Sequence, residues 1–191
     1  MRTTMNFKIK RIAAASIILA MLTLSAACSG NSKTSETETS SEYSGFEHID
    51  SLDGKSLGEL GLLGEKLTVL NVWATWCPPC IGELPHLEDI SQHFNGNGVK
   101  VIGIMQDGVN ETFEPQENTI ANGITLLENA GVTYPNLVPD ADFFSQYIAE
   151  MQVFPTTYFL DADGNIISTL QGAQDFDGWK DTIDDALNEL S

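Results

Sequence analysis

The sequence is poor in cysteine and in positive charge. It has three cysteines among 191 residues, and nine Lys and Arg residues against 27 Asp and Glu residues, so its formal net charge is −18. So few cysteines exclude a domain that depends on several disulfides. The acidic balance argues against nucleic acid as a partner, because phosphates are bound mainly by Lys and Arg. No internal repeat is visible, and a hydrophobic content of 42% is ordinary for a globular protein.

The few basic residues gather at the N-terminus. Four of the nine precede residue 12, and residues 12–24 then form a nearly unbroken apolar stretch. A basic start followed by a short apolar stretch is typical of an export signal, and this stretch is short for a membrane-spanning helix.

The apolar stretch leads into Ser25-Ala26-Ala27-Cys28, which resembles the lipobox of bacterial lipoproteins. At a lipobox the cysteine receives a diacylglycerol group and the segment before it is removed. We therefore predict that residues 1–27 are a lipoprotein signal peptide and that Cys28 is the lipid attachment site. Ser25 stands where a lipobox usually has Leu, so plain secretory cleavage near Ala27 and an uncleaved anchor stay open as alternatives.

Residues 28–45 are rich in Ser, Thr, Glu and Gly and nearly free of large apolar side chains. Such a segment cannot bury enough apolar surface to offset the entropy lost on ordering, so we predict a disordered tether. Without the signal peptide the chain keeps five basic residues against 27 acidic ones. Membrane attachment would therefore depend on the lipid and not on attraction to anionic head groups.

Residues 46–191 are predicted to form one domain in which strands alternate with helices. Apolar, β-branched runs predict strands, and apolar residues at helical spacing predict helices. The predicted strands are residues 66–73, 99–105, 156–160 and 166–170, and the predicted helices are residues 77–94, 118–130, 142–151 and 176–190. Glycines in residues 46–65 predict a strand or hairpin extension, and residues 106–116 form a polar loop of open role. This order predicts an α/β three-layer fold with a central mixed sheet flanked by helices and one helix inserted in the middle.

The remaining cysteines, Cys77 and Cys80, are separated by two prolines where a predicted strand turns into a helix. Only the thiolate is nucleophilic, and a helix N-terminus lowers the pKa of a thiol through its dipole and free amides. We therefore predict a redox-active disulfide, in which Cys77 attacks a partner disulfide and Cys80 resolves the mixed disulfide. Because Pro78 and Pro79 lack amide protons, we expect only a moderately lowered pKa for Cys77.

A metal site is the competing interpretation of two close cysteines, but it would need a second pair of ligands. The three histidines, His48, His86 and His93, do not lie at a matching spacing. We therefore expect no metal and no cofactor. Residues 161–165 are acidic, yet they lack the Gly at position six and the Glu at position twelve of a calcium-binding EF-hand loop, so they predict a hairpin turn.

The run Asn71-Val72-Trp73-Ala74-Thr75-Trp76-Cys77-Pro78-Pro79-Cys80 resembles the active-site segment of TlpA/ResA-type thioredoxin-like proteins. Glu83 and Pro85 continue the Cys-x-x-Glu-x-Pro pattern of that family, and residues 153–157 resemble its cis-proline segment. The similarity extends from about residue 46 to the C-terminus. It implies a thioredoxin-like fold and an exported, membrane-anchored thiol–disulfide oxidoreductase.

The resemblance also implies roles for four further residues. Pro155 would be the cis-proline beside the cysteine pair, and the backbone of Phe154 would pair with an extended substrate. Trp76 would be half-exposed as part of the docking surface. Glu83 would transfer protons or tune the thiol pKa values, because Asn71 stands where thioredoxin has a buried Asp. The alternatives are an ordinary proline that opens a strand and a solvated carboxylate in the first turn of a helix.

Members of the family take electrons from a membrane donor of the CcdA/DsbD type and reduce exported proteins, including apocytochrome c and methionine sulfoxide reductases. The resemblance thus implies a lipid-anchored reductase that faces outside the cytoplasm, with exported protein thiols and disulfides as partners; we expect a monomer. Three alternatives stay open: a disulfide-forming oxidase, a peroxiredoxin-like peroxidase, and a binding lipoprotein whose cysteine pair is only structural.

Overall fold

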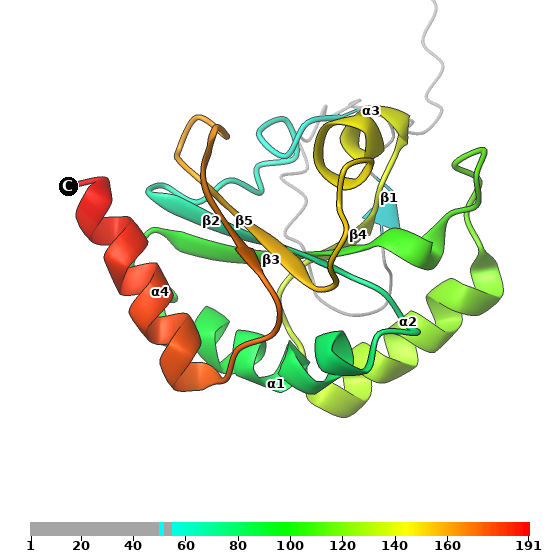
Figure 1. The fold of residues 1–191 in the computed structure, drawn as a ribbon, viewed down its shortest axis with the longest axis horizontal. Helices are drawn as coiled ribbons and strands as arrows, with labels where there is room; N and C mark the ends of the chain where they lie inside the picture. The colour runs from blue at the N-terminus through cyan, green and yellow to red at the C-terminus, as the bar shows by residue number, and fades with distance from the viewer. Residues whose placement is uncertain (1–49, 52–54) are drawn as a thin grey trace, which may run out of the picture. The chain divides into compact units, whose positions relative to one another are not determined.

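The computed structural model describes residues 50–51 and 55–191 (Figure 1). The predicted signal peptide, Cys28 and the predicted tether lie outside the described residues, so these expectations stay predictions. The described part forms a six-stranded sheet in the order β1-β4-β3-β2-β5-β6. The strands are β1 (Asp50–Ser51), β2 (Leu67–Trp73), β3 (Val99–Met105), β4 (Asn136–Val138), β5 (Thr156–Leu160) and β6 (Ile166–Gln171). The helices are α1 (Pro78–His93), η1 (Gln106–Gly108), α2 (Glu117–Ala130), α3 (Ala141–Phe143), η2 (Phe144–Ile148) and α4 (Phe176–Glu189).

The centre of the sheet is β2, all seven residues of which are buried. It pairs in parallel with β3 and antiparallel with β5, so the predicted mixed sheet is confirmed. A strand that is covered on both faces has no solvent side, and its sequence is accordingly apolar almost throughout. Because Trp73 pairs with Met105, β2 and β3 end at the same edge of the sheet. We call this the carboxyl edge and the opposite one the amino edge.

Helices cover both faces of the sheet, which gives the three predicted layers (Figure 1). On one face α1, α2 and α4 pack against side chains such as Val69, Trp73 and Phe159. On the other face α3, η2 and the segment around Leu57 pack against side chains that include Leu70 and Ile102. The core is thus divided by the sheet into two apolar clusters, and the predicted α/β three-layer fold is confirmed.

The predicted element order lacks one strand, and one predicted helix is too long. No strand was expected between the second helix and residues 142–151, yet β4 lies there and pairs with both β3 and β1. For the N-terminal extension a strand or a hairpin was expected, and the structure has the strand β1, which pairs in parallel with β4, more than 80 residues further along the chain. The helix expected at residues 142–151 is shorter and consists of α3 followed by the π-helical turn η2.

Candidate redox site

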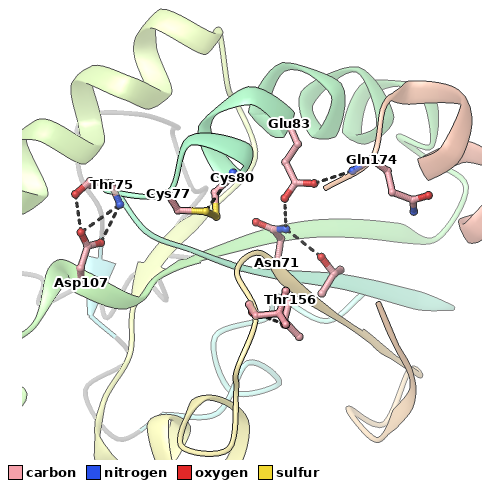
Figure 2. Close-up of a disulfide and its surroundings, with 10 residues drawn as sticks. Asn71, Thr75, Cys77, Cys80, Glu83, Asp107, Thr156 and Gln174 are labelled. Carbon is pink, nitrogen blue, oxygen red and sulfur yellow. Dashed lines mark hydrogen bonds between the residues drawn. A yellow bond between two sulfur atoms is a disulfide. The ribbon is translucent and has the colours of Figure 1, made fainter. Parts of the chain in front are cut away.

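Cys77 and Cys80 form a disulfide at the start of α1, directly after the loop that follows β2 (Figure 2). Cys77 is the N-cap residue, and its Sγ accepts a hydrogen bond of 3.3 Å from the backbone amide of Cys80. Pro78 and Pro79 occupy the first two helical positions, where a missing amide proton costs no hydrogen bond within the helix. The amide of Cys80 is therefore the first helical amide that can stabilise negative charge on the Cys77 sulfur.

The two cysteines differ in their access to solvent. Cys77 keeps 3% of its surface exposed, whereas Cys80 has none. A partner that approaches from solvent therefore meets the sulfur of Cys77 and not that of Cys80. This difference supports the predicted assignment of Cys77 as the attacking residue.

An apolar surface patch lies beside the disulfide and consists of Trp76, Val153 and Phe154. Trp76 is 60% exposed and Val153 is 38% exposed. The rings of Trp76 and Phe154 meet edge to face, with centroids 5.2 Å apart. Phe154 precedes Pro155 through a cis peptide bond, as expected for this segment. Since Thr156 pairs with Val72 near the end of β2, this segment reaches the carboxyl edge, where the redox loop begins.

Glu83 lies one helical turn after Cys80 and is buried, with 1% of its surface exposed. The alternative of a solvated carboxylate is therefore wrong. Its Oε1 accepts a hydrogen bond of 2.9 Å from Asn71 Nδ2, and its Oε2 accepts one of 3.3 Å from the backbone amide of Gln174 (Figure 2). Burial raises the pKa of Glu83 to about 7, although Asn71, Gln174 and the indole of Trp179 act to lower it. An acid with this pKa can give or take a proton near neutral pH.

Asn71 stands where thioredoxin has a buried Asp. An amide cannot titrate, and here its nitrogen donates a hydrogen bond to Glu83. Besides Glu83, its amide nitrogen reaches Thr157 Oγ1 of β5 at 3.0 Å, and all three side chains are buried. Tyr134 is buried too. Burial raises the pKa of its hydroxyl well above the usual value, and the nearby negative charges of Glu83 and Glu88 raise it further. Sequence reasoning did not find Thr157 or Tyr134, since they come from elements distant in the chain.

Asp107 is a third residue whose contact with the site sequence reasoning did not find. It lies in η1, immediately after β3, and its two carboxylate oxygens accept hydrogen bonds from the amide of Thr75 at 3.1 and 3.2 Å. The hydroxyl of Thr75 donates to the same carboxylate (Figure 2). Thr75 is two residues before Cys77, so Asp107 fixes the redox loop to the end of the neighbouring strand. The polar composition of residues 106–116 was the only sign of this role.

The described residues contain neither a metal-binding cluster nor a helix that could span a membrane. No three His, Cys, Asp or Glu side chains among them lie close enough together to hold a metal ion. No helix in residues 55–191 is long and apolar enough to cross a membrane.

Residues 49–169 match the sequence profile of the AhpC/TSA family. The chain belongs to the AhpC/TSA family. Among curated relatives, it is 28% identical to a protein of Oceanobacillus iheyensis named thiol-disulfide oxidoreductase ResA. The alignment has 132 residues and covers 69% of this chain and 62% of the relative. It is 27% identical to the Bacillus subtilis protein of the same name, in an alignment of 124 residues that covers 65% of this chain and 63% of the relative. The matched region thus spans less than two thirds of the length of these relatives.

Solved structures agree with this AhpC/TSA assignment. A thiol:disulfide interchange protein of the thioredoxin family from Chlorobium tepidum superposes with a TM-score of 0.55 and 27% identity, over 73% of this chain and 92% of that one. A putative thioredoxin from Neisseria meningitidis superposes with a TM-score of 0.53 and 25% identity, over 74% of this chain and 87% of that one. The predicted thioredoxin-like fold and the resemblance to ResA-type proteins are thereby confirmed.

Proposed function

We propose that this protein is an extracytoplasmic thiol–disulfide oxidoreductase that acts as a protein-disulfide reductase. The observation that carries the proposal is the disulfide at the start of α1, in which only Cys77 reaches solvent. The relatives named thiol-disulfide oxidoreductase ResA support the reaction type. The buried carboxyl of Glu83, one turn further along α1, supports proton transfer at the same site.

The reaction begins with both cysteines reduced. The Cys77 thiolate attacks one sulfur of a client disulfide, that disulfide breaks, and the other client sulfur leaves as a thiolate. Cys80, after losing its proton, then attacks the Cys77 sulfur of the mixed disulfide and releases the second client thiolate. Two electrons have passed to the client, whose thiolates take up protons, and the protein is left with the Cys77–Cys80 disulfide.

Glu83 is proposed to accept the proton that Cys80 must lose before it can attack. Cys80 is fully buried, so water cannot take this proton directly, and Glu83 lies one helical turn away. A pKa of about 7 lets the carboxylate accept a proton at neutral pH and release it again. Trp76, Phe154 and Pro155 are proposed to receive the client chain beside the disulfide.

The N-terminal sequence and the family resemblance support a proposal for the cellular setting. The export signal and Cys28 support a lipid anchor on the outer face of the cell membrane. We propose that a membrane protein of the CcdA/DsbD type supplies the electrons, and that a monomer passes them to exported clients of the apocytochrome c or methionine sulfoxide reductase type. Anchoring beside a membrane donor would raise the effective concentration of the two redox partners.

The proposal is tested by trapping clients in cells with Cys80→Ser, which leaves the mixed disulfide on Cys77 unresolved. We expect exported proteins to be captured through a bond that reducing agents release, and none with the Cys77→Ser/Cys80→Ser control. Capture of no exported protein would contradict the reductase proposal.

The direction of electron flow is tested separately by the reduction potential of the pair. A reductase should have a potential near that of thioredoxin, about −270 mV, and an oxidase one near that of DsbA, about −120 mV. A value near the second figure would favour the disulfide-forming oxidase. Direct consumption of peroxide by the purified protein would favour the peroxidase instead.

A further inference from the structure

The basic residues of the described chain are distributed unevenly over the domain. Between residues 67 and 179 the sequence has fifteen acidic residues, and its one basic residue there is Lys100. The described residues contain four lysines and no arginine. The positions of these four lysines show which parts of the surface have basic side chains beside the acidic ones.

Two of the lysines lie at the amino edge of the sheet, away from the disulfide. Lys66 directly precedes β2, and Lys100 is the second residue of β3, where its Nζ donates to the carbonyl of Gly61. A third, Lys55, lines a cavity together with the carboxylates of Asp140, Asp142 and Asp163, so its positive charge is surrounded by negative ones.

The distance between the two edges is large enough for screening to separate them. A seven-residue strand is about 20 Å long at roughly 3.3 Å per residue. The Debye length at 0.1 M salt is about 10 Å, so the lysines of the amino edge contribute little potential at the disulfide. The fourth lysine, Lys180 of α4, is paired with Asp184 at 2.6 Å and therefore offers little free positive charge.

The carboxyl edge carries acidic residues next to the redox loop. Asp107 is bonded to Thr75, two residues before Cys77. The loop that continues from Asp107 adds Glu111 and Glu114, whose side chains are exposed. This loop is held in place by a bridge between Val109 and Pro115, so its charges keep a defined position. A partner at the disulfide thus meets an exposed apolar patch with acidic residues beside it.

We propose that the apolar patch of Trp76, Val153 and Phe154 docks a basic protein segment, one with Lys or Arg close to its reactive cysteine. This inference rests on the proposed redox function and names the chemistry of its partner. The patch would contact apolar groups of the segment, and the carboxylates of the loop would attract its positive charges. A second copy of this chain is disfavoured as the occupant, because it would bring the same acidic edge to the interface.

The test compares three cyclic disulfide peptides that differ only in the residues flanking their cysteines: Lys-Lys, Ser-Ser or Glu-Glu. The full-length protein is reduced in detergent, freed of reductant, and mixed with each peptide at pH 7.5. The rate of exchange is divided by the rate of the same peptide with dithiothreitol, which corrects for the intrinsic reactivity of each disulfide.

At low ionic strength we expect the Lys-flanked peptide to react about tenfold faster than the Glu-flanked one, a modest value for electrostatic steering. The ratio should approach one in about 0.5 M NaCl because of screening. Glu111→Lys should lower the ratio about twofold or more. Glu65→Lys is the matched control, since it changes the net charge equally but lies next to Lys66 at the amino edge, and it should leave the ratio nearly unchanged.

A ratio of one at low salt, with all three peptides reduced, would overturn the docking proposal and leave the oxidoreductase proposal intact. An equal effect of Glu65→Lys and Glu111→Lys would also overturn it, because net charge alone would then explain the preference. If the second-order rate constant for exchange falls as the protein concentration rises, self-association covers the patch, and its occupant is a second copy of this chain. Failure to reduce any of the peptides would overturn the oxidoreductase proposal, and this one with it.

Discussion

Glu83 shows how one residue can acquire a chemical role from its surroundings. Its carboxyl has hydrogen-bond donors on both oxygens, yet the pKa rises to about 7 because loss of solvent outweighs the lowering by Asn71, Gln174 and Trp179. The folded state therefore holds a proton on Glu83 over a pH range in which the unfolded chain has released it. Between the usual value of 4.5 and about 7, protonation of this residue is coupled to stability.

The first prediction follows from this coupling. Since the folded state binds more protons than the unfolded state between pH 4.5 and about 7, the free energy of unfolding should fall as the pH rises through that window. Glu83→Gln keeps the shape without the titration, so this part of the pH dependence should disappear. Urea unfolding of both proteins at a series of pH values measures how the free energy of unfolding depends on pH. Identical pH profiles for the two proteins would mean that Glu83 ionises as freely in the folded state as in water.

The second prediction concerns Asp107 and its link to the redox loop. Asp107→Ala removes the acceptor for the amide and hydroxyl of Thr75, which should cost about 1–3 kcal/mol of stability and slow exchange at Cys77. Asp107→Asn keeps one oxygen acceptor and should restore part of both losses. Stopped-flow exchange with a disulfide peptide, alongside urea unfolding, measures the two effects. If the Asn variant is no better than the Ala variant, the link does not position the loop through hydrogen bonds.

At the scale of elements, β4 connects the outer strand β1 to the centre of the sheet. Asn136 of β4 accepts a hydrogen bond of 2.9 Å from the indole Nε1 of Trp73 in β2, and so spans β3 between them. This hydrogen bond can pass over β3 because Gly103 of β3 has no side chain. A Cβ at that position would lie 1.9 Å from Asn136 Oδ1.

The third prediction is therefore that Gly103→Ala displaces Asn136 and destabilises the fold by about 1–3 kcal/mol, as overpacking usually does. The matched control is Gly82→Ala in α1, where an added Cβ meets nothing within 4 Å. That change should be neutral or stabilising by about 0.5–1 kcal/mol, because Ala has the higher helix propensity. Thermal and urea unfolding compare the two variants. Equal stabilities would show that Asn136 moves aside without cost.

The same elements explain what the sequence could and could not predict. The long strands β2 and β3 and the helices α1, α2 and α4 carry strong periodic patterns, and their bounds were predicted to within a few residues. In contrast, β4 has three residues and follows a proline, so its pattern is too short to separate from a loop. The two-residue β1 becomes a strand only because β4 is there to pair with it.

For the site, the local motif revealed Cys77, Cys80 and Glu83, because all three lie within two turns of one helix. The hydrogen-bond donors to Glu83 come from β2 and from the segment before α4, and Asn71 of β2 also donates to Thr157 of β5. The link from Asp107 to Thr75 crosses between two strands. Such contacts depend on the pairing of distant segments, which one sequence read alone does not specify.

At the scale of the molecule, the disulfide and two of the four described lysines lie at opposite edges of the sheet. The amino edge has Lys66 and Lys100 among its acidic residues, whereas the carboxyl edge has the disulfide with acidic residues beside it. The domain is therefore suited to exchange electrons with partners at one edge only. Its function depends on whether Cys77, and not Cys80, is the sulfur that those partners meet.

The most direct test is to react the full-length Cys80→Ser and Cys77→Ser variants with one disulfide peptide at pH 7.5. Mass spectrometry after proteolysis then locates each adduct and separates it from any on Cys28. We predict a mixed disulfide on Cys77 in the first variant, and an adduct on Cys80 that forms at least about tenfold more slowly in the second, because Cys80 has no exposed surface. Equal rates for the two cysteines, or a faster reaction of Cys80, would contradict the assignment of Cys77 as the attacking thiol.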